Sequence, residues 1–245
     1  MRPDVQIYDN YTAEDFLVWE TLMNRQMGIL QDTVSESFLK AIDVIGFKPS
    51  NIPDFRKVNE ILAQTTGWEI LTVPGLCPPK EFFQLLGNKK FTSTCWLRSL
   101  NQLDYIEEPD MFHDAFAHMP MLTNQPYVDF LENLSGLALK HIENKWAIEV
   151  LSRIYWFTIE FGLIRENGKI RIYGAGILSS AGETKYSLSD EPTHYEYDVR
   201  KIMNTPFWKD KFQDKYFIIE SYEQLYQSLP EIEAVLEEMV AEEAK

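Results

Sequence analysis

Apolar and aromatic residues recur along this chain mostly at spacings of three and four, which is the period of a buried helix face. The first example follows Thr12 and Asp15, which are spaced as in a helix-initiating capping box. Its apolar positions are Phe16, Trp19, Met23, Met27 and Leu30. By the same criterion we expect further helices over residues 37–45, 53–66, 80–86, 126–142 and 147–164, and one that begins at Pro230.

Strands are expected to be few and short. The runs with strand-like composition are residues 68–73, 91–98, 169–173 and 216–220, and the pair Asn167 and Gly168 is typical of a hairpin turn. The strands do not alternate regularly with helices, and neither a GxGxxG nor a Walker motif occurs. The pattern therefore predicts a predominantly helical α+β fold, with residues 1–245 forming one domain.

Composition and charge narrow the class of protein. The chain has 245 residues, 45% of them hydrophobic, and a formal net charge of −15 from 38 acidic and 23 basic residues. This charge argues against binding to nucleic acid or to anionic membranes. No apolar run has the length of a membrane span, and the N-terminus lacks the apolar core of a signal peptide. Two cysteines form no disulfide framework, so we expect a cytoplasmic protein.

Two of the four histidines, His113 and His118, lie within the short segment from Pro109 to Pro120. Neutral imidazole is the commonest protein ligand for metals, so this pair indicates a metal site. The two prolines suit the start and the end of a short helix. In a regular α-helix the two rings would diverge by roughly 140°, so we expect a distortion that brings them together. The HExxH zinc motif differs, because its spacing puts both rings on one face.

Glu160 is the carboxylate whose surroundings stand out. It is the one acid in the apolar and aromatic stretch from Ile154 to Ile164, where an ionised carboxylate is costly to bury unless a cation compensates. The alternative is a glutamate on the exposed stripe of a surface helix. Two histidines and one carboxylate with open coordination positions form the facial triad of non-heme Fe(II) oxygenases. The sequence therefore indicates a site of this kind.

The segments from His113 to His118 and from Tyr155 to Leu163 resemble the catalytic domain of the pterin-dependent aromatic amino acid hydroxylases. Within that family, the chain is most similar to the short bacterial phenylalanine 4-hydroxylases. Three more stretches agree in order and spacing, namely residues 73–82, the segment that ends at Arg98, and residues 173–183. The resemblance covers about residues 67–222, and more weakly the N-terminal helices. It implies a single catalytic domain with a few short strands around an iron site.

The resemblance also implies how the metal and the amino acid are bound. His113, His118 and Glu160 would be the iron ligands. Arg98 would pair with the carboxylate of the amino acid through two parallel hydrogen bonds, oriented by Asp110. The other implied residues of the substrate pocket are Trp156, Phe161 and Ser179. Each has an ordinary alternative, such as a surface arginine for Arg98 or helix core for the aromatic residues.

For the pterin, the resemblance implies stacking on Phe82, and Tyr155 would lie nearby. Asp114 matches a glutamate of the family that faces the pterin and the iron-bound water. Simpler roles exist here too, such as a favourable charge at a helix N-terminus for Asp114. Backbone contacts would come from Gly75, Leu76 and Cys77. The implied reaction uses Fe(II), a tetrahydropterin and dioxygen to hydroxylate an aromatic amino acid, with phenylalanine to tyrosine as the first expectation.

Several positions depart from the family pattern. Ala117 stands where the family usually has glycine, and Asp114 is one methylene shorter than the usual glutamate. The other departures are Trp96 for tyrosine, Ile106 for threonine, Glu107 for proline, and Lys209 for an aliphatic residue. The iron triad is intact, while hydroxylation of tyrosine or tryptophan, or at another ring position, stays an alternative. Trp156 favours phenylalanine or tyrosine over tryptophan.

The remaining expectations concern assembly and other classes of function. We expect a monomer without a regulatory or tetramerisation domain, whose partner is a small aromatic amino acid. One competing class is a zinc hydrolase built on the same two histidines and Glu160, although no separate general base of the HExxH type is present. The other is a non-catalytic protein derived from the family that binds a metal or an amino acid. The departures at Ala117, Ile106 and Lys209 keep that second class open.

Overall fold

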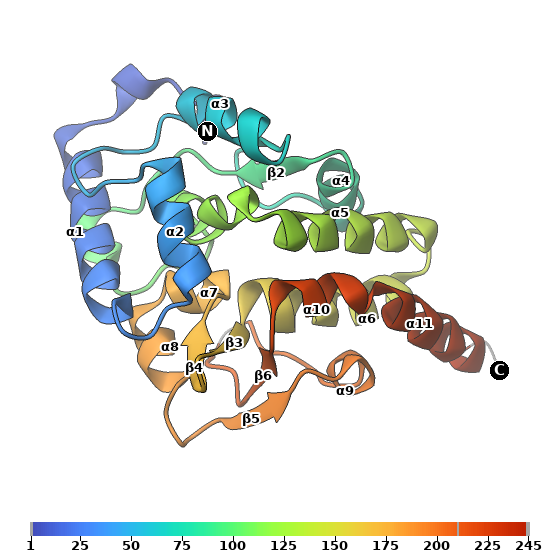
Figure 1. Ribbon diagram of the computed structural model, residues 1–245. Coiled ribbons are helices and arrows are strands. Elements are labelled where there is room, and N and C mark those ends of the chain that lie inside the picture. The colour runs from blue at the N-terminus through green and yellow to red at the C-terminus, as the bar shows by residue number, and fades with distance from the viewer. Residues whose placement is uncertain (1, 210, 244–245) are drawn as a thin grey trace.

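The computed structural model describes residues 2–209 and 211–243. Helices form most of it, and two small sheets lie on opposite sides of the central helices, which confirms the predominantly helical α+β class (Figure 1). The α-helices are α1 (Ala13–Leu30), α2 (Glu36–Ile45), α3 (Phe55–Thr65), α4 (Pro79–Leu86), α5 (Gln125–Lys140), α6 (Lys145–Tyr155), α7 (Ala175–Leu178), α8 (Ala181–Tyr186), α9 (Val199–Met203), α10 (Tyr222–Gln227) and α11 (Leu229–Glu243). The strands are β1 (Glu69–Thr72), β2 (Lys90–Ser93), β3 (Gly162–Glu166), β4 (Lys169–Ile172), β5 (Thr193–Glu196) and β6 (Lys215–Ile219).

The N-terminal helix begins where the capping box predicts. The Thr12 side chain accepts a hydrogen bond from the backbone of Asp15, and the Asp15 carboxylate accepts one from the backbone of Thr12. This satisfies two amide groups that the first turn of a helix leaves unpaired. The apolar stripe of α1 is buried, including Trp19 and Leu30, while Phe16 and Met27 are partly buried against the core.

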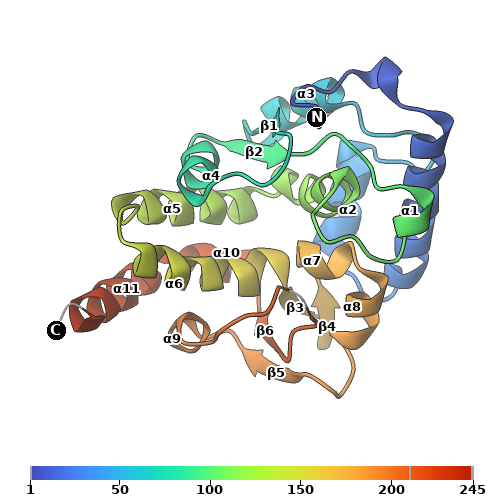
Figure 2. The same cartoon turned by 180° about the vertical axis from the view of Figure 1, so that it is seen from behind.

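Helices α5 and α6 form the centre of the molecule and lie side by side (Figure 2). Each starts at an asparagine cap, Asn124 for α5 and Asn144 for α6. At its far end α6 continues into a π-helix, η5 (Trp156–Glu160), which runs directly into β3. Glu160 is therefore fixed at the junction between the central helix and the larger sheet.

The larger sheet has the strand order β4-β3-β6-β5. Strands β3 and β4 form the predicted hairpin, and its turn residues Asn167 and Gly168 have φ angles of +52° and +75°. These angles suit the turn that Asn-Gly favours between antiparallel strands. Strand β6 runs parallel to both β3 and β5. The smaller sheet is the parallel pair β1 and β2.

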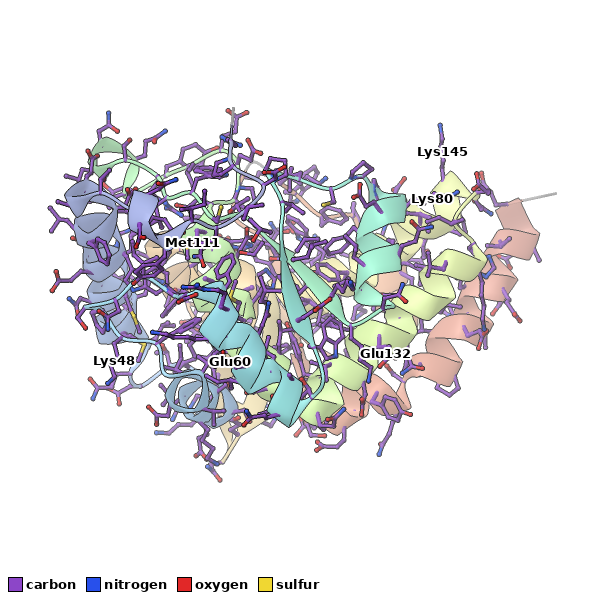
Figure 3. The ribbon with its side chains drawn as sticks, turned by 90° about the horizontal axis from the view of Figure 1, so that it is seen from above. Lys48, Glu60, Lys80, Met111, Glu132 and Lys145 are labelled. Carbon is purple, nitrogen blue, oxygen red and sulfur yellow. The ribbon has the colours of Figure 1, made fainter. Side chains whose placement is uncertain are left out.

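A second π-helix, η3 (Phe112–His118), lies in the interior and packs against α1, β2 and α7. The residue just before it, Met111, is fully buried, whereas Lys145 at the start of α6 points into solvent (Figure 3). No described helix is long and apolar enough to span a bilayer.

Two predicted boundaries are wrong. The helix expected over residues 147–164 leaves α-helical geometry at Trp156, and residues 162–166 form β3. A short apolar run cannot distinguish a buried strand from a buried helix, which explains this error. The strand expected over residues 91–98 ends at Ser93, because the chain then leaves the pairing with β1. The elements between residues 175 and 203 and the helix α10 were not predicted.

Candidate metal centre and adjoining cavities

The predicted ligands His113, His118 and Glu160 converge on one point. Nε2 of His118 lies 3.2 Å from Nε2 of His113 and 3.3 Å from Oε1 of Glu160. Nε2 of His113 lies 3.7 Å from Oε2 of Glu160. Two donor atoms bound to one ion at about 2.1 Å and at right angles to each other lie about 3 Å apart. The three side chains therefore suit neighbouring positions on one face of a single metal ion.

The distortion expected between the two histidines is the π-helix η3 itself. A π-helix closes its hydrogen bonds between residues five apart, so it winds more loosely than an α-helix. Residues at that spacing, such as His113 and His118, are thereby brought towards the same face. Glu160 is the last residue of the other π-helix, η5. All three predicted ligands thus lie on π-helical backbone, which is often found at functional sites.

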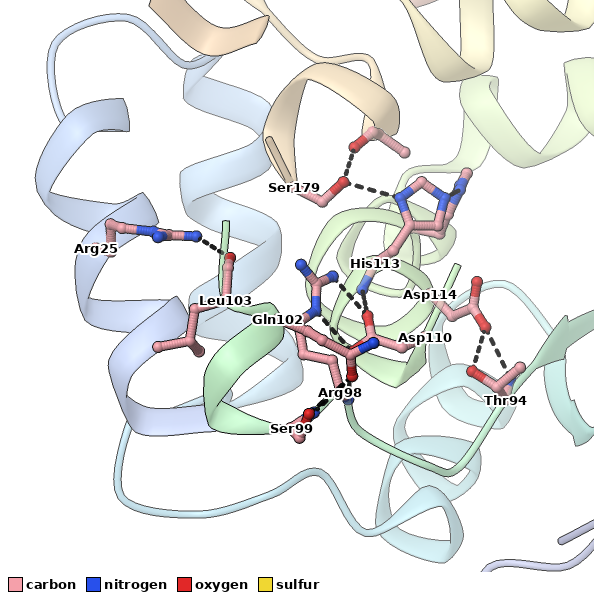
Figure 4. Close-up of polar contacts among 12 residues, drawn as sticks. Arg25, Thr94, Arg98, Ser99, Gln102, Leu103, Asp110, His113, Asp114 and Ser179 are labelled. Atoms are coloured by element: carbon pink, nitrogen blue, oxygen red, sulfur yellow. Dashed lines mark hydrogen bonds and ion pairs between the residues drawn. The ribbon is translucent and has the colours of Figure 1, made fainter. Parts of the chain in front are cut away.

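Ser179 fixes the tautomer of His113 (Figure 4). The Ser179 hydroxyl donates its only proton to the carbonyl of Ala175 at 2.9 Å, so it must accept a hydrogen bond from Nδ1–H of His113 at 2.8 Å. Nε2 of His113 is therefore unprotonated, and its lone pair faces His118 and Glu160. Such an orientation by a hydrogen bond at the other ring nitrogen is usual for metal-binding histidines. The residues present fit an iron ion.

The protonation states also suit a divalent cation. Burial lowers the pKa of His113 to about 4, which keeps its imidazole neutral. Burial alone would raise the pKa of Glu160, but its interactions with His118, His113 and Tyr155 outweigh this effect and leave it below the usual value. The neutral imidazole of His113 and the ionised carboxylate of Glu160 are the forms in which these side chains bind metals.

Gly174 holds the backbone of Glu160 in place. A Cβ atom at Gly174 would stand 2.5 Å from the carbonyl oxygen of Glu160, much closer than such atoms approach in proteins. The amide of Gly174 also donates a hydrogen bond to the carbonyl of Gly162 at 3.0 Å. Only glycine allows this close approach, so the chain that leads into α7 is positioned directly against the predicted ligand Glu160.

The Ser179→Ala variant is expected to bind Fe(II) about 10- to 100-fold more weakly, because Nδ1–H of His113 loses the acceptor that orients the ring. The measurement is a competition titration against a chelator, with circular dichroism to show that the fold is kept. Ser189→Ala is a matched control, since its hydroxyl bonds the carbonyl of Tyr186 instead of a metal ligand. An unchanged affinity in a folded Ser179→Ala protein would contradict this role for Ser179.

Arg98 and Asp110 form the buried ion pair that the resemblance implies. Asp110 accepts hydrogen bonds from Nε of Arg98 at 2.9 Å and from Nη2 at 2.7 Å, and Arg98 is only 6% exposed. Asp110 also accepts the backbone N–H of His113, so the pair is joined to the metal centre (Figure 4). A guanidinium has five donors, and three remain, including one complete edge formed by Nη1 and Nη2.

A cavity of about 290 Å³ opens on one side of the metal centre, and His113, His118 and Glu160 all line it. Phe82 and Tyr155 form part of its wall, with ring centroids 5.6 Å apart in an edge-to-face arrangement. The other predicted pterin contacts that line it are Gly75, Leu76, Cys77 and Asp114. A flat heterocycle would find both an aromatic face and polar groups here.

Asp114 is held by two hydrogen bonds from Thr94, one from its backbone N–H at 2.7 Å and one from its hydroxyl at 2.8 Å. Burial raises the pKa of Asp114 to about 7, although the bonds from Thr94 act in the opposite direction. The carboxyl group can therefore hold a proton near neutral pH, in direct reach of the cavity that His113 and His118 line.

A second cavity, also of about 290 Å³, lies on the other side of His113. Of the predicted substrate residues, Arg98, Phe161 and Ser179 line it. Trp156 instead lines the first cavity, and its ring lies 4.8 Å from that of Phe161. His113, Pro109 and Lys209 border both cavities, so the two spaces adjoin beside the metal centre.

The departures from the family pattern lie in different environments. Ala117 is buried within η3, and the backbone there retains its π-helical form. Ile106, Glu107 and Lys209 line the second cavity and affect its shape and polarity. Trp96 packs under the guanidinium of Arg2 at 3.9 Å and is not among the described residues that line either cavity.

Thr94 and Phe207 contact predicted site residues but were not themselves predicted. Thr94, which binds Asp114, follows directly after β2 and belongs to no motif. Phe207 stacks on Trp156 with ring centroids 4.4 Å apart, and it belongs to a segment whose structure was not predicted. The only available signal was the adjacent aromatic pair Phe207 and Trp208 in an otherwise polar stretch.

Comparison with known proteins agrees with this geometry. Residues 4–241 match the family model described as biopterin-dependent aromatic amino acid hydroxylase. The chain is 42% identical over 230 residues to the phenylalanine-4-hydroxylase of Ralstonia nicotianae. This alignment covers 92% of this chain and 73% of that protein. It is 43% identical over 224 residues to the phenylalanine-4-hydroxylase of Chromobacterium violaceum. This alignment covers 90% of this chain and 74% of that protein. A crystal structure of C. violaceum phenylalanine hydroxylase with Fe(III) and 7,8-dihydrobiopterin has a TM-score of 0.91 at 42% identity, covering 98% of this chain and 86% of that one.

Proposed function

This chain belongs to the biopterin-dependent aromatic amino acid hydroxylases, and we propose on that premise that it converts L-phenylalanine to L-tyrosine with Fe(II), a tetrahydropterin and dioxygen. The observation that carries the proposal is the convergence of His113, His118 and Glu160 between two adjoining cavities. One cavity has aromatic walls suited to a pterin, and the other contains a guanidinium suited to a carboxylate. The relatives named phenylalanine-4-hydroxylase support phenylalanine as the substrate.

Iron and the reduced pterin, when bound, supply the activation of dioxygen, with one oxygen atom passing to the pterin and the other to the aromatic ring. The protein contributes ligation, orientation and the exclusion of water. His113, His118 and Glu160 would hold the iron through one face, which leaves the opposite face towards the cavities. Ser179 keeps Nε2 of His113 unprotonated and therefore able to bind the metal.

On the amino acid side, Arg98 would bind the substrate carboxylate through the guanidinium edge that Asp110 leaves unused. Asp110 keeps the guanidinium fixed, so little side-chain entropy is lost on binding. Phe161, which lines the cavity that contains Arg98, would then bound the space for the aromatic ring, and Trp156 would complete this wall where the two cavities adjoin. Their position beside Glu160 brings the ring close to the metal centre, as the reaction requires.

On the pterin side, Phe82 would stack on the ring system, with Tyr155 beside it and the backbone of residues 75–77 at its edge. Asp114 would exchange a proton with the pterin or with a water molecule near the metal. Its raised pKa, about 7, suits this task near neutral pH.

We further propose that residues 1–245 act as a single catalytic domain, and that the enzyme works as a monomer in the cytoplasm. Residues 1, 210, 244 and 245 lie outside the described structure. The acidic net charge of −15 supports small molecules rather than nucleic acids as partners.

The test is reconstitution with Fe(II) and tetrahydropterin under anaerobic conditions, followed by oxygen and product analysis with each aromatic amino acid. We expect tyrosine from phenylalanine, in amounts that depend on both iron and pterin. A hydroxylated product from tyrosine or tryptophan alone would assign another substrate. The absence of oxygen consumption with all three amino acids would support a non-catalytic protein, and hydrolysis with zinc and no pterin would support a hydrolase.

A further inference from the structure

Gln213 is a buried glutamine, 2% exposed, whose side-chain amide is fully used inside the protein. Its Oε1 accepts hydrogen bonds from Nε1–H of Trp156 at 3.0 Å and from the backbone N–H of Trp208 at 3.3 Å. Its Nε2 donates to the carbonyls of Trp208 at 2.6 Å and Lys211 at 3.3 Å. A primary amide has two acceptor sites and two donors, so none remains for a ligand.

The residue that Gln213 holds is an aromatic wall of the site. The indole of Trp156 stacks on Phe207 and contacts the tilted ring of Phe161, with ring centroids 4.4 and 4.8 Å away. Stacking contacts of this kind fix the plane of a ring better than its rotation within that plane. The hydrogen bond from Nε1–H of Trp156 to Gln213 opposes rotation of the indole within its plane. Without this bond, the indole N–H would be unpaired next to an apolar surface.

A second buried group anchors Gln213 from behind. Glu183 is 4% exposed, and its carboxylate accepts hydrogen bonds from the backbone N–H of Gln213 at 3.2 Å and from the hydroxyl of Tyr216. These contacts join α8 to the chain that enters β6. Glu183 and Tyr216 thus connect Gln213 to the larger sheet, and Gln213 connects the indole of Trp156 to the same sheet.

We propose that Gln213 is a positioning residue that acts through Trp156 to set where the aromatic ring of the substrate lies relative to the metal. Trp156 and Glu160 are the first and last residues of the same π-helix, so the wall and the metal ligand share one rigid element. Displacement of a reacting group by about 1 Å can cost about 100-fold in rate. This inference rests on the proposed hydroxylase function and adds a residue that does not touch the substrate.

The first test is a double-mutant comparison of Gln213→Leu with and without Trp156→Phe. In the unaltered background we expect the amount of hydroxylated amino acid per tetrahydropterin oxidised to fall by about tenfold or more, with the amino acid KM changed by less than about threefold. In the Trp156→Phe background, which lacks the indole N–H, the same substitution should change that ratio by less than about twofold. An equal fall in both backgrounds would overturn the proposal, because Gln213 would then only stabilise residues 207–213.

The second test needs no turnover. In metal-free, ¹⁵N-labelled protein, the indole N–H of Trp156, assigned by its loss in Trp156→Phe, should exchange with solvent about tenfold faster in Gln213→Leu. Gln227→Leu, at an exposed glutamine, should leave the exchange of the Trp156 indole N–H unchanged. Unchanged exchange in Gln213→Leu would overturn the inference. Failure of the wild-type protein to hydroxylate any amino acid would instead count against the proposed function.

Discussion

We expect the Glu160→Gln variant to bind Fe(II) at least about 100-fold more weakly than the unaltered protein, and to lose hydroxylation with the metal. Glutamine has almost the same size, so the packing of η5 against β3 is kept. It lacks the negative charge that compensates the cation, and its amide is a far poorer metal ligand than a carboxylate. Loss of a direct ligand should exceed the effect of removing a residue that only orients one, such as Ser179.

The measurement is iron content after desalting, together with a chelator competition titration and a thermal unfolding curve. Glu149→Gln is the matched control on α6, which leads into η5, because its carboxylate is exposed and pairs with Arg153. That control should bind iron and hydroxylate normally. A Glu160→Gln protein that retains iron and full activity would remove Glu160 from the ligand set.

The second large effect is expected at Arg98, where substrate binding and stability must be separated. Arg98→Lys keeps the charge but loses the planar edge, so the KM of the amino acid should rise about 10- to 100-fold. Arg98→Ala should in addition destabilise the protein by about 3–5 kcal/mol, because it leaves the fully buried Asp110 without a partner. An elevated KM in the alanine variant alone would therefore be ambiguous.

A paired variant removes that ambiguity. Arg98→Met combined with Asp110→Asn removes both buried charges, and the asparagine keeps a side-chain oxygen that can accept a backbone N–H of Arg98 or His113, as Asp110 does. Its free energy of unfolding in urea should recover most of the loss seen in Arg98→Ala, while its KM should remain high. A normal KM in the folded double variant would show that Arg98 does not bind the substrate carboxylate.

The sequence indicated the three convergent side chains of the candidate metal centre better than it indicated the backbone that carries them. Scarce histidines and one acid in an apolar stretch are visible without a structure, because their chemistry is unusual for their surroundings. The π-helical form of residues 156–160 was not visible, and neither was the start of β3 at Gly162, since the apolar run suits a helix and a strand equally well. The distortion between His113 and His118 was predicted as a requirement of the spacing, but not its type.

The residues that support the site were hardest to predict because their roles come from contacts between distant segments. Gln213 and Trp156 are 57 positions apart, and Thr94 and Asp114 are 20 apart. Neither Thr94 nor Gln213 belongs to a local pattern that periodicity or motif reasoning can use. The placement of Trp156 in the first cavity, rather than beside Arg98, also depends on how α6 leaves its regular geometry.

The loose winding of η3 has a consequence for recognising metal sites in other sequences. A search that assumes 3.6 residues per turn assigns His113 and His118 to different faces and discards the pair. Because a π-turn differs from an α-turn by one inserted residue, a single insertion can change a spacing of four into a spacing of five while both ligands stay on one side. The number of residues between two ligands thus indicates the type of helix that carries them. Two histidines five residues apart can be used as a search pattern for π-helical metal sites.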